Sequence, residues 1–244
     1  MISSAFWQMN IRKGIFIRMF DERIEKAIYI LWVDMESKRA KEAKELLEQA
    51  ANDGVADAYY FLGRIYAGPC FVNPIFKFEE NDVKTEEYFN LSIENGSAIG
   101  MFAARRMAGF EPRCGSMVCE PYHSVEEVWD AVCSLADSGE IFAKYLIANA
   151  YYYGDIVGLL NLDFSSLTEA QIEARLRGWA EKAIEMYEEL ISKGMVMGVY
   201  NYIDIITSGD YGVPINTKRA KEIEKIYKKK TSTGLAKVFS NIFS

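Results

Sequence analysis

A segment of eighteen residues recurs in this chain after 180 positions. Residues 37–54 and 217–234 each begin with Ser or Thr, continue with Lys-Arg-Ala-Lys-Glu and end at a glycine. A shared start, length and end indicates one structural unit that is used twice. Such units bury apolar surface by stacking on their neighbours and leave an extended surface exposed. The recurrence therefore favours binding over chemistry.

The repeat continues through the middle of the chain when the segments are aligned on the glycine that ends them. These marker glycines are separated by 42, 43, 55 and 40 residues: Gly54, Gly96, Gly139, Gly194 and Gly234. Glycine adopts the left-handed conformation without steric cost, so each marker predicts the end of one helix and a turn into a second. Small residues four positions after a marker allow the two helices to approach closely. They are Ala58, Gly100, Ala143 and Gly198.

These turns predict an all-α protein, an α-α superhelix or solenoid of about five helical-hairpin repeats. The repeat units are expected at about 35–68, 84–109, 124–154, 168–209 and 217–244. Residues 1–34 form an N-terminal segment whose helix, at 21–33, packs on the array. The composition agrees, because half of the 244 residues are apolar and only five are proline. The last repeat unit is a cap whose second helix is short or absent.

Two capping boxes predict helix starts in the later repeat units. In this motif a hydroxyl and an acid or amide three residues on satisfy each other's backbone donors. Ser124 with Glu127 and Thr168 with Gln171 match it. The helix that starts at Thr168 is long, and Gly178 is a predicted bend or break within it.

The first repeat unit resembles the Sel-one-like repeat, a relative of the tetratricopeptide repeat. The resemblance rests on residues 43–54, followed by Ala58, Leu62-Gly63, Tyr66 and Gly68 at the family's spacing. Residues 211–214, Tyr-Gly-Val-Pro, resemble the family's linker into the next helix. The middle repeat units depart from the pattern, since Ser92-Ile93 and Leu135-Ala136 replace its alanine pair. The resemblance implies a superhelical adaptor that assembles protein complexes, lacks catalytic activity and lines its concave surface with first helices.

The position nine residues before each marker glycine carries four acids and then one base. The series is Glu45, Glu87, Asp130, Glu185 and Lys225. The position six residues before it gives Glu48, Asn90, Cys133, Glu188 and Lys228. On the third first helix, Glu126, Asp130 and Asp137 share one face, opposite Val128, Val132, Leu135 and Ala136. We interpret the acids as the lining of a groove that binds a basic segment; the alternative is that they are ordinary solvent-facing charges.

Two connections between repeat units form a second candidate surface, because insertions in repeat proteins lie on one face and aromatic residues often anchor interfaces. Residues 69–83 carry Phe71, Phe76 and Phe78, and residues 110–123 carry Tyr122 and His123. The alternative is that these aromatic side chains cover the edges of the hairpins.

Charge, targeting signals and cysteine usage restrict the partner and the compartment. The net charge of −7 argues against a nucleic-acid backbone as the main partner. No apolar run approaches the ~18 residues that span a bilayer. The order of apolar and basic residues at the N-terminus is the reverse of a secretory signal, which leaves an organellar targeting segment as the alternative. The four cysteines share no repeat position, so we expect reduced thiols and a cytoplasmic location.

Catalytic and metal chemistry have little support in the sequence. Cys114, Cys119 and His123 have no evident fourth partner for zinc, and a disulfide between the two cysteines would need an oxidising compartment. His123 is the one histidine, no nucleophile motif accompanies it, and no phosphate-binding glycine loop occurs. We expect no enzyme activity, no metal and no cofactor. The leading hypothesis is a non-enzymatic adaptor; the alternatives are an inhibitor or immunity protein that masks a basic effector, and an enzyme that uses residues 110–123.

Overall fold

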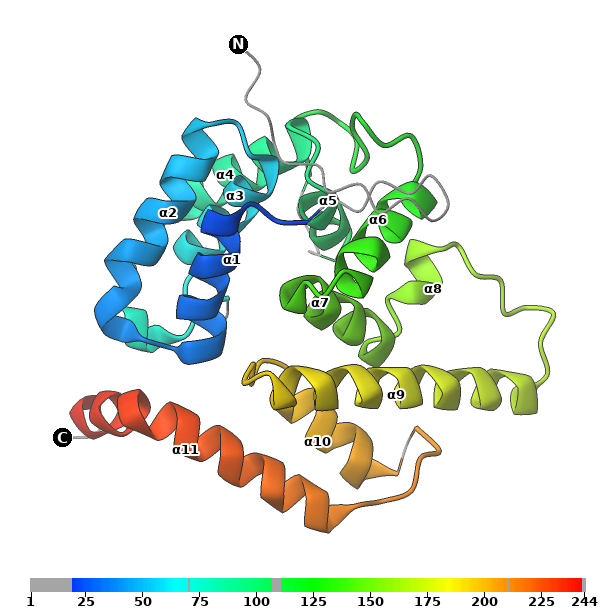
Figure 1. Ribbon diagram of the computed structural model, residues 1–244. Coiled ribbons are helices and arrows are strands. Elements are labelled where there is room, and N and C mark those ends of the chain that lie inside the picture. Colours follow the sequence, from blue (N-terminus) through cyan, green and yellow to red (C-terminus); the bar gives the residue numbers. More distant parts are fainter. Residues whose placement is uncertain (1–18, 70, 107–110, 210, 243–244) are drawn as a thin grey trace. The chain divides into compact units, whose positions relative to one another are not determined.

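The computed structural model describes residues 19–69, 71–106, 111–209 and 211–242, with side chains up to residue 230. Every regular element in this described part is a helix, so the predicted all-α class is confirmed (Figure 1). The chain forms two compact lobes, an N-terminal lobe at Met1–Ala143 and a C-terminal lobe at Lys144–Ser244. The boundary falls inside the third expected repeat unit, and the exact repeat boundaries stay a prediction.

In the N-terminal lobe, each helix from α1 to α5 packs against the helix that follows it. Contacts join α1 to α2, α2 to α3, α3 to α4, α4 to α5 and α5 to α6, as in an α-α array. The helices are α1 (Glu22–Ile28), α2 (Ala40–Asn52), α3 (Ala56–Tyr66), α4 (Asp82–Glu94), α5 (Ala98–Ala104), α6 (Val125–Asp137) and α7 (Ile141–Tyr152), which continues into the C-terminal lobe. Short helical turns η1 (Tyr29–Asp34), η2 (Ser37–Arg39) and η3 (Pro74–Phe76) lie between them.

The leading helix predicted at 21–33 is confirmed as α1 continued by η1. Asp21 caps it, because its side chain accepts a hydrogen bond from the backbone N–H of Arg23. Ile24, Ala27 and Ile28 are buried, and α1 packs against α2. At the far end, Met35 takes a left-handed conformation with φ 58°, which ends the helical run before η2.

The first four marker glycines end their helices as predicted. Gly54, Gly96, Gly139 and Gly194 all have positive φ, between 80° and 105°. Their backbone N–H groups bond to carbonyls of the preceding helix, and the next helix begins within a few residues. The small residues after the markers also allow close packing. A Cβ at Gly198 would press on the Tyr187 ring, and Ala58 and Ala143 are fully buried.

Aromatic side chains form the centre of the N-terminal lobe. The rings of Phe61 and Phe142 are 4.9 Å apart, and Trp32 lies 5.2 Å from Phe142. Arg64 is buried beside them, with only 5% of its surface exposed. Its guanidinium donates to the hydroxyl of Tyr60 at 3.1 Å and to the backbone carbonyl of Phe71 at 2.9 Å. The core therefore encloses a charged group that holds the connection after α3 in place.

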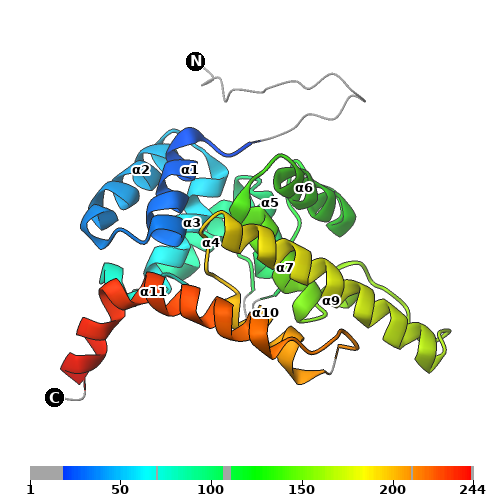
Figure 2. The ribbon, with the colours of Figure 1, turned by 60° about the horizontal axis from the view of Figure 1, so that its bottom comes forward.

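The described residues of the C-terminal lobe contain the rest of α7 and four further helices. They are α8 (Ile156–Leu159), α9 (Glu169–Ser192), α10 (Val199–Ser208) and α11 (Thr217–Ile242). Helix α10 packs against α9 and against α11. The capping box at Thr168 and Gln171 is formed as predicted. Gly178 does not break α9, which runs as one helix of 24 residues, and its first turns extend beyond α10 (Figures 1 and 2).

The predicted helix end at Gly234 is wrong, because α11 runs through this glycine to Ile242. A glycine inside a helix costs only about 1 kcal/mol relative to alanine, so good helix-forming neighbours can carry the helix across it. The residues that follow it include Leu235, Ala236 and Lys237 and no proline. The repeated segment is therefore shared in its start but not in its end.

Candidate functional site

The side chains nine residues before the marker glycines are all exposed, one on each first helix. We call the four acids among them the acidic ladder: Glu45 on α2, Glu87 on α4, Asp130 on α6 and Glu185 on α9. The corresponding residue of α11, Lys225, is exposed as well. Three acids of the ladder belong to the N-terminal lobe, and Glu185 belongs to the C-terminal lobe. The structure therefore agrees with the sequence about the exposure of this position.

The position six residues before the glycines does not form a second exposed row. Asn90 is fully buried and accepts a hydrogen bond from the backbone N–H of Arg113 at 2.7 Å. Cys133 is half-buried, and Glu48 is half-buried with a carboxylate oxygen 3.6 Å from Lys44 Nζ. Residues at this one repeat position therefore lie in different environments in different helices. The sequence could not reveal this, because an amide or a carboxylate is compatible with either environment.

Glu188, which we predicted as a groove residue, is held within the C-terminal lobe. Arg219 on α11 donates through Nε to Oε1 of Glu188 at 2.8 Å and also bonds its second oxygen. The hydroxyl of Tyr202 on α10 donates to the same carboxylate. The Arg219 hydrogen bond lowers the pKa of Glu188, and burial followed by Glu188 raises the pKa of Tyr202 to about 12. This carboxylate joins three helices and is not an open binding group.

Helix α6 has the two faces that the sequence predicts. Glu126, Asp130 and Asp137 are exposed. The opposite face is buried and consists of Val128, Val132, Leu135 and Ala136. Among the described residues, no basic side chain forms an ion pair with these three acids, and residues 114–143 contain no Lys or Arg. The exposed face of α6 is therefore uncompensated negative charge.

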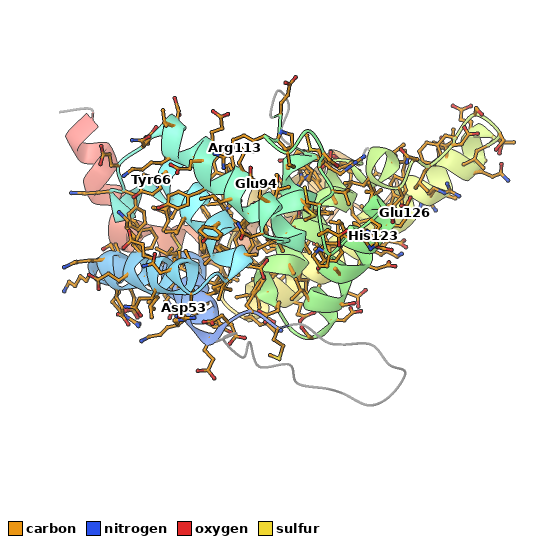
Figure 3. The ribbon with its side chains drawn as sticks, turned by 90° about the horizontal axis from the view of Figure 1, so that it is seen from above. Asp53, Tyr66, Glu94, Arg113, His123 and Glu126 are labelled. Atoms are coloured by element: carbon orange, nitrogen blue, oxygen red, sulfur yellow. The ribbon has the colours of Figure 1, made fainter. Side chains whose placement is uncertain are left out.

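The start of α6 differs slightly from the predicted capping box. The Ser124 hydroxyl accepts from the backbone N–H of Glu127 at 3.2 Å, as expected. The Glu127 side chain accepts instead from the backbone N–H of His123 at 2.8 Å, one residue before the cap. Figure 3 shows His123 and Glu126 close together at this end of the helix. His123 Nδ1 lies 3.5 Å from Oε1 of Glu120, and its side chain is exposed.

The connection between α3 and α4 is partly buried. Phe76 is buried with 5% exposure, and its ring stacks on that of Phe78 at 5.9 Å. Phe71 is half-buried, and its backbone carbonyl accepts from Trp32 Nε1 at 3.1 Å and from Arg64. Phe78 lines a small cavity of about 180 Å³ together with Ile65, Val72, Pro74, Lys77 and Glu80. Phe76 thus covers the hairpin edge, while Phe71 and Phe78 retain partial exposure.

The connection between α5 and α6 is fastened to the end of α4. Arg113 bonds Asn90 through its backbone and pairs with Glu94, with 3.2 Å between Nε and Oε1 (Figure 3). Further along, the Glu120 carbonyl passes so close to Gly96 that a Cβ there would lie 2.7 Å from it. Tyr122 is half-buried. The described residues contain no group of three or more His, Cys, Asp or Glu side chains that could hold a metal ion.

Comparison with known proteins finds a likeness among solved structures. No family model matches this chain, and no curated protein matches it. It is similar to a Sel1 repeat protein. That protein, known from a crystal structure and originating from Oxalobacter formigenes, is 15% identical over 79% of this chain and 82% of its own, with a TM-score of 0.33. The repeat family named there is the one that residues 43–68 resemble in sequence.

Two polar groups in the core were not anticipated from the sequence. Arg64 has the same spacing from its marker glycine as Asn149, which is also buried, but no pattern predicted this position as polar and internal. Glu140 directly follows Gly139 and looks like a turn residue, yet only 6% of it is exposed. Desolvation is the main reason why the pKa of Glu140 rises to about 7.

No described helix is both long and apolar enough to span a bilayer.

Proposed function

We propose that this chain is a non-enzymatic adaptor that binds a basic protein segment along its first helices. The observation that carries the proposal is the acidic ladder, an exposed acid at one position on four first helices. In the repeat family that the sequence resembles, first helices line the concave face. Within the N-terminal lobe, a segment laid along α2, α4 and α6 would meet one carboxylate on each helix, and Glu185 offers a further carboxylate on α9 of the C-terminal lobe.

The strength of each contact in the ladder is modest, because the carboxylates are exposed. An exposed ion pair contributes roughly 0.2–1 kcal/mol and weakens with salt. Several such pairs mainly speed association and select partners of positive charge. Glu126 and Asp137 extend the negative surface on α6 without any described ion pair to reduce it. We therefore expect salt-sensitive binding with a preference for Lys and Arg.

A partner also needs contacts that are not purely electrostatic. Phe71, Phe78, Tyr122 and His123 are partly or fully exposed on the two long connections, and we propose them as secondary contacts. Phe76 is left out of this set because it is buried. A cytoplasmic location, expected from the cysteines and the N-terminus, remains part of the proposal.

The test is a selection from a random peptide display library on the full-length chain at low and high salt. Wild type should enrich peptides of net positive charge, and the enrichment should fall as salt rises. A variant with E45K, E87K, D130K and E185K should lose this bias and should bind the selected peptides at least tenfold more weakly, about 1.4 kcal/mol. Circular dichroism confirms that the variant remains helical.

A matched control reverses four exposed acids outside the ladder and outside the two connections, E22K, D34K, E86K and E173K, with the same change in net charge and the same division between the lobes. If the control loses binding to the same extent, net charge rather than the ladder selects the peptides. Selected peptides without a positive bias would refute the proposal. A single basic protein that binds tightly at one-to-one stoichiometry would indicate the inhibitor or immunity role instead of the adaptor.

A further inference from the structure

We propose that Cys114 and Cys119 form a reversible dithiol–disulfide site in the connection between α5 and α6. Neither cysteine is in a disulfide in this structure, and their Sγ atoms lie 3.0 Å apart. Cys114 is exposed and Cys119 is half-buried. A disulfide requires the two sulfur atoms to move only about 1 Å closer, since the S–S bond is about 2.05 Å long.

The four residues between the cysteines fold back so that both thiols point at one acceptor. The Ser116 carbonyl lies 2.8 Å from Cys114 Sγ and 3.8 Å from Cys119 Sγ. The Ser116 hydroxyl donates to the Val118 carbonyl at 2.8 Å and accepts from the Val118 N–H at 3.1 Å. Gly115 has φ 69°, a conformation that suits glycine in this reversal. The turn therefore holds the thiols together before any bond forms.

The residues that flank the pair are anchored on the end of α4. Arg113, directly before Cys114, bonds Asn90 and pairs with Glu94. Glu120, directly after Cys119, packs its backbone against Gly96. Because both flanks are already fixed, closing the disulfide costs little further chain entropy. This arrangement distinguishes the pair from two cysteines that meet by chance in a loose loop.

The two thiols differ in exposure, and this difference determines which of them reacts first. Burial, followed by the hydrogen bond and charge of Cys114, raises the pKa of Cys119 to about 11. Cys119 is therefore protonated at neutral pH, and the exposed Cys114 is the thiol that a reagent reaches first.

The oxidant that fits this chemistry is a low-molecular-weight disulfide such as oxidised glutathione. The Cys114 thiolate attacks one sulfur of the disulfide, which forms a mixed disulfide and releases one glutathione thiolate. The Cys119 thiolate then attacks the Cys114 sulfur, which forms the protein disulfide and releases the second. Two electrons pass from the protein to the oxidant, and the two thiol protons are taken up by the two glutathione thiolates. Excess dithiothreitol reverses the reaction.

The experiment treats the full-length chain with oxidised glutathione and maps the product by mass spectrometry. Cyanogen bromide cleaves after Met117, between the two cysteines, so fragments 108–117 and 118–186 stay together only if a disulfide joins them. Cys133 lies in the second fragment, and the mapping is therefore done on C133S as well as on wild type. We expect the linked fragments in both, and separate fragments after dithiothreitol.

Single replacements decide whether the pair acts as a unit. C119S should stop at the mixed disulfide with glutathione on Cys114, and C114S should react at least tenfold more slowly at position 119. C70S should behave as wild type. Linkage of Cys114 to Cys70 or Cys133, crosslinked dimers as the main product, or full alkylation of both thiols after oxidation would overturn the proposal.

Discussion

Arg219 on α11 binds both oxygens of Glu188 on α9 and also pairs with Glu222 in its own helix, with 3.2 Å between Nη1 and Oε2. Its counterpart in the first copy of the repeated segment is Arg39, which bonds Glu42 through Nε at 2.7 Å. Both copies thus contain the same arginine and the same glutamate three residues on. Only the second copy uses the arginine to reach an earlier helix. The repeated segment is therefore a helix start that can also fasten two helices together.

Replacing Arg219 with methionine should loosen α11 while the rest of the chain keeps its fold. Methionine keeps the apolar stem but removes every hydrogen bond to Glu188, and the partly exposed site limits the loss to about 1 kcal/mol. Amide hydrogen exchange at residues 217–226 should be faster in R219M.

The control for this change is K218M, because Lys218 is the exposed neighbour and forms no ion pair among the described residues. Its exchange rates should match wild type. Equal exchange in R219M and wild type would show that the contact with Glu188 does not hold α11.

Much of the architecture could be predicted because helix ends obey local rules. Glycine at a helix end, a capping residue and an amphipathic pattern act over a few residues. The Ser124 cap and the two faces of α6, and the capping box of α9, formed as these signals predict, although Glu127 does not complete the box at Ser124. The end of α11 was mispredicted because glycine permits a helix end without enforcing one. The local sequence is compatible with both outcomes.

Glu140 should make the N-terminal lobe less stable as the pH rises from about 5 to 8. Its Oε1 accepts from the backbone N–H of Phe20 at 2.9 Å, and the acids Glu25 on α1 and Asp57 on α3 face it. Desolvation, then Glu25 and Asp57, raise its pKa from 4.5 to about 7. Between these values the folded chain holds more protons than the unfolded chain. The free energy of unfolding therefore falls with rising pH, by up to about 1.4 kcal/mol per unit.

The variant E140Q should remove this slope. Glutamine carries no charge and keeps an oxygen that can accept from Phe20, so at pH 8 the variant should be more stable than wild type. Urea unfolding at a series of pH values measures the difference between the two proteins. The exposed acid Glu126 provides the control, and E126Q should retain the wild-type slope. Parallel profiles for wild type and E140Q would contradict the assignment.

Two glycines inside helices should respond to alanine with opposite signs. A Cβ at Gly63 in α3 would lie 2.7 Å from Cδ1 of Phe89, whose ring is held against Tyr60. Overpacking outweighs the gain in helix propensity, so we expect G63A to lose about 1–2 kcal/mol. A Cβ at Gly178 in α9 would meet no neighbouring atom within 4 Å, and G178A should gain roughly 0.5–1 kcal/mol. Thermal unfolding of wild type and of both variants measures these changes in stability. A G63A variant more stable than wild type would show that the Phe89 ring can move away from the added methyl group.

The pairing of individual residues at the candidate site could not be predicted from the sequence, because it depends on contacts between residues that are distant along the chain. Glu188 and Glu185 are three positions apart on α9 and look alike in a helical pattern. One is exposed, and the other is bonded by Arg219 from 31 positions away. Exposure of the acidic ladder followed from helix periodicity alone. The pairing of Glu188 depends on Tyr202 from α10 and Arg219 from α11, which no local pattern describes.

Arg64 provides the sharpest test of how the core of the N-terminal lobe is held. Its guanidinium carbon lies 4.9 Å from the Phe142 ring, 5.1 Å from Phe71 and 5.7 Å from Trp32. Its Nε is buried and has no hydrogen-bond partner among the described residues, so part of the charge is desolvated without compensation. The R64A variant should lose about 2–4 kcal/mol, because it removes two hydrogen bonds and leaves a cavity among the rings.

Methionine at this position separates packing from charge. R64M fills most of the space between the rings but leaves the Phe71 carbonyl without its donor, so we expect a stability between those of R64A and wild type. Amide hydrogen exchange in α3 ranks wild type, R64M and R64A by stability, and Trp32 fluorescence reports the packing of the rings. If R64M were as stable as wild type, the desolvation of the guanidinium would cost as much as its hydrogen bonds and ring contacts contribute. Equal losses in R64M and R64A would instead assign the whole effect to the bonds with Phe71 and Tyr60.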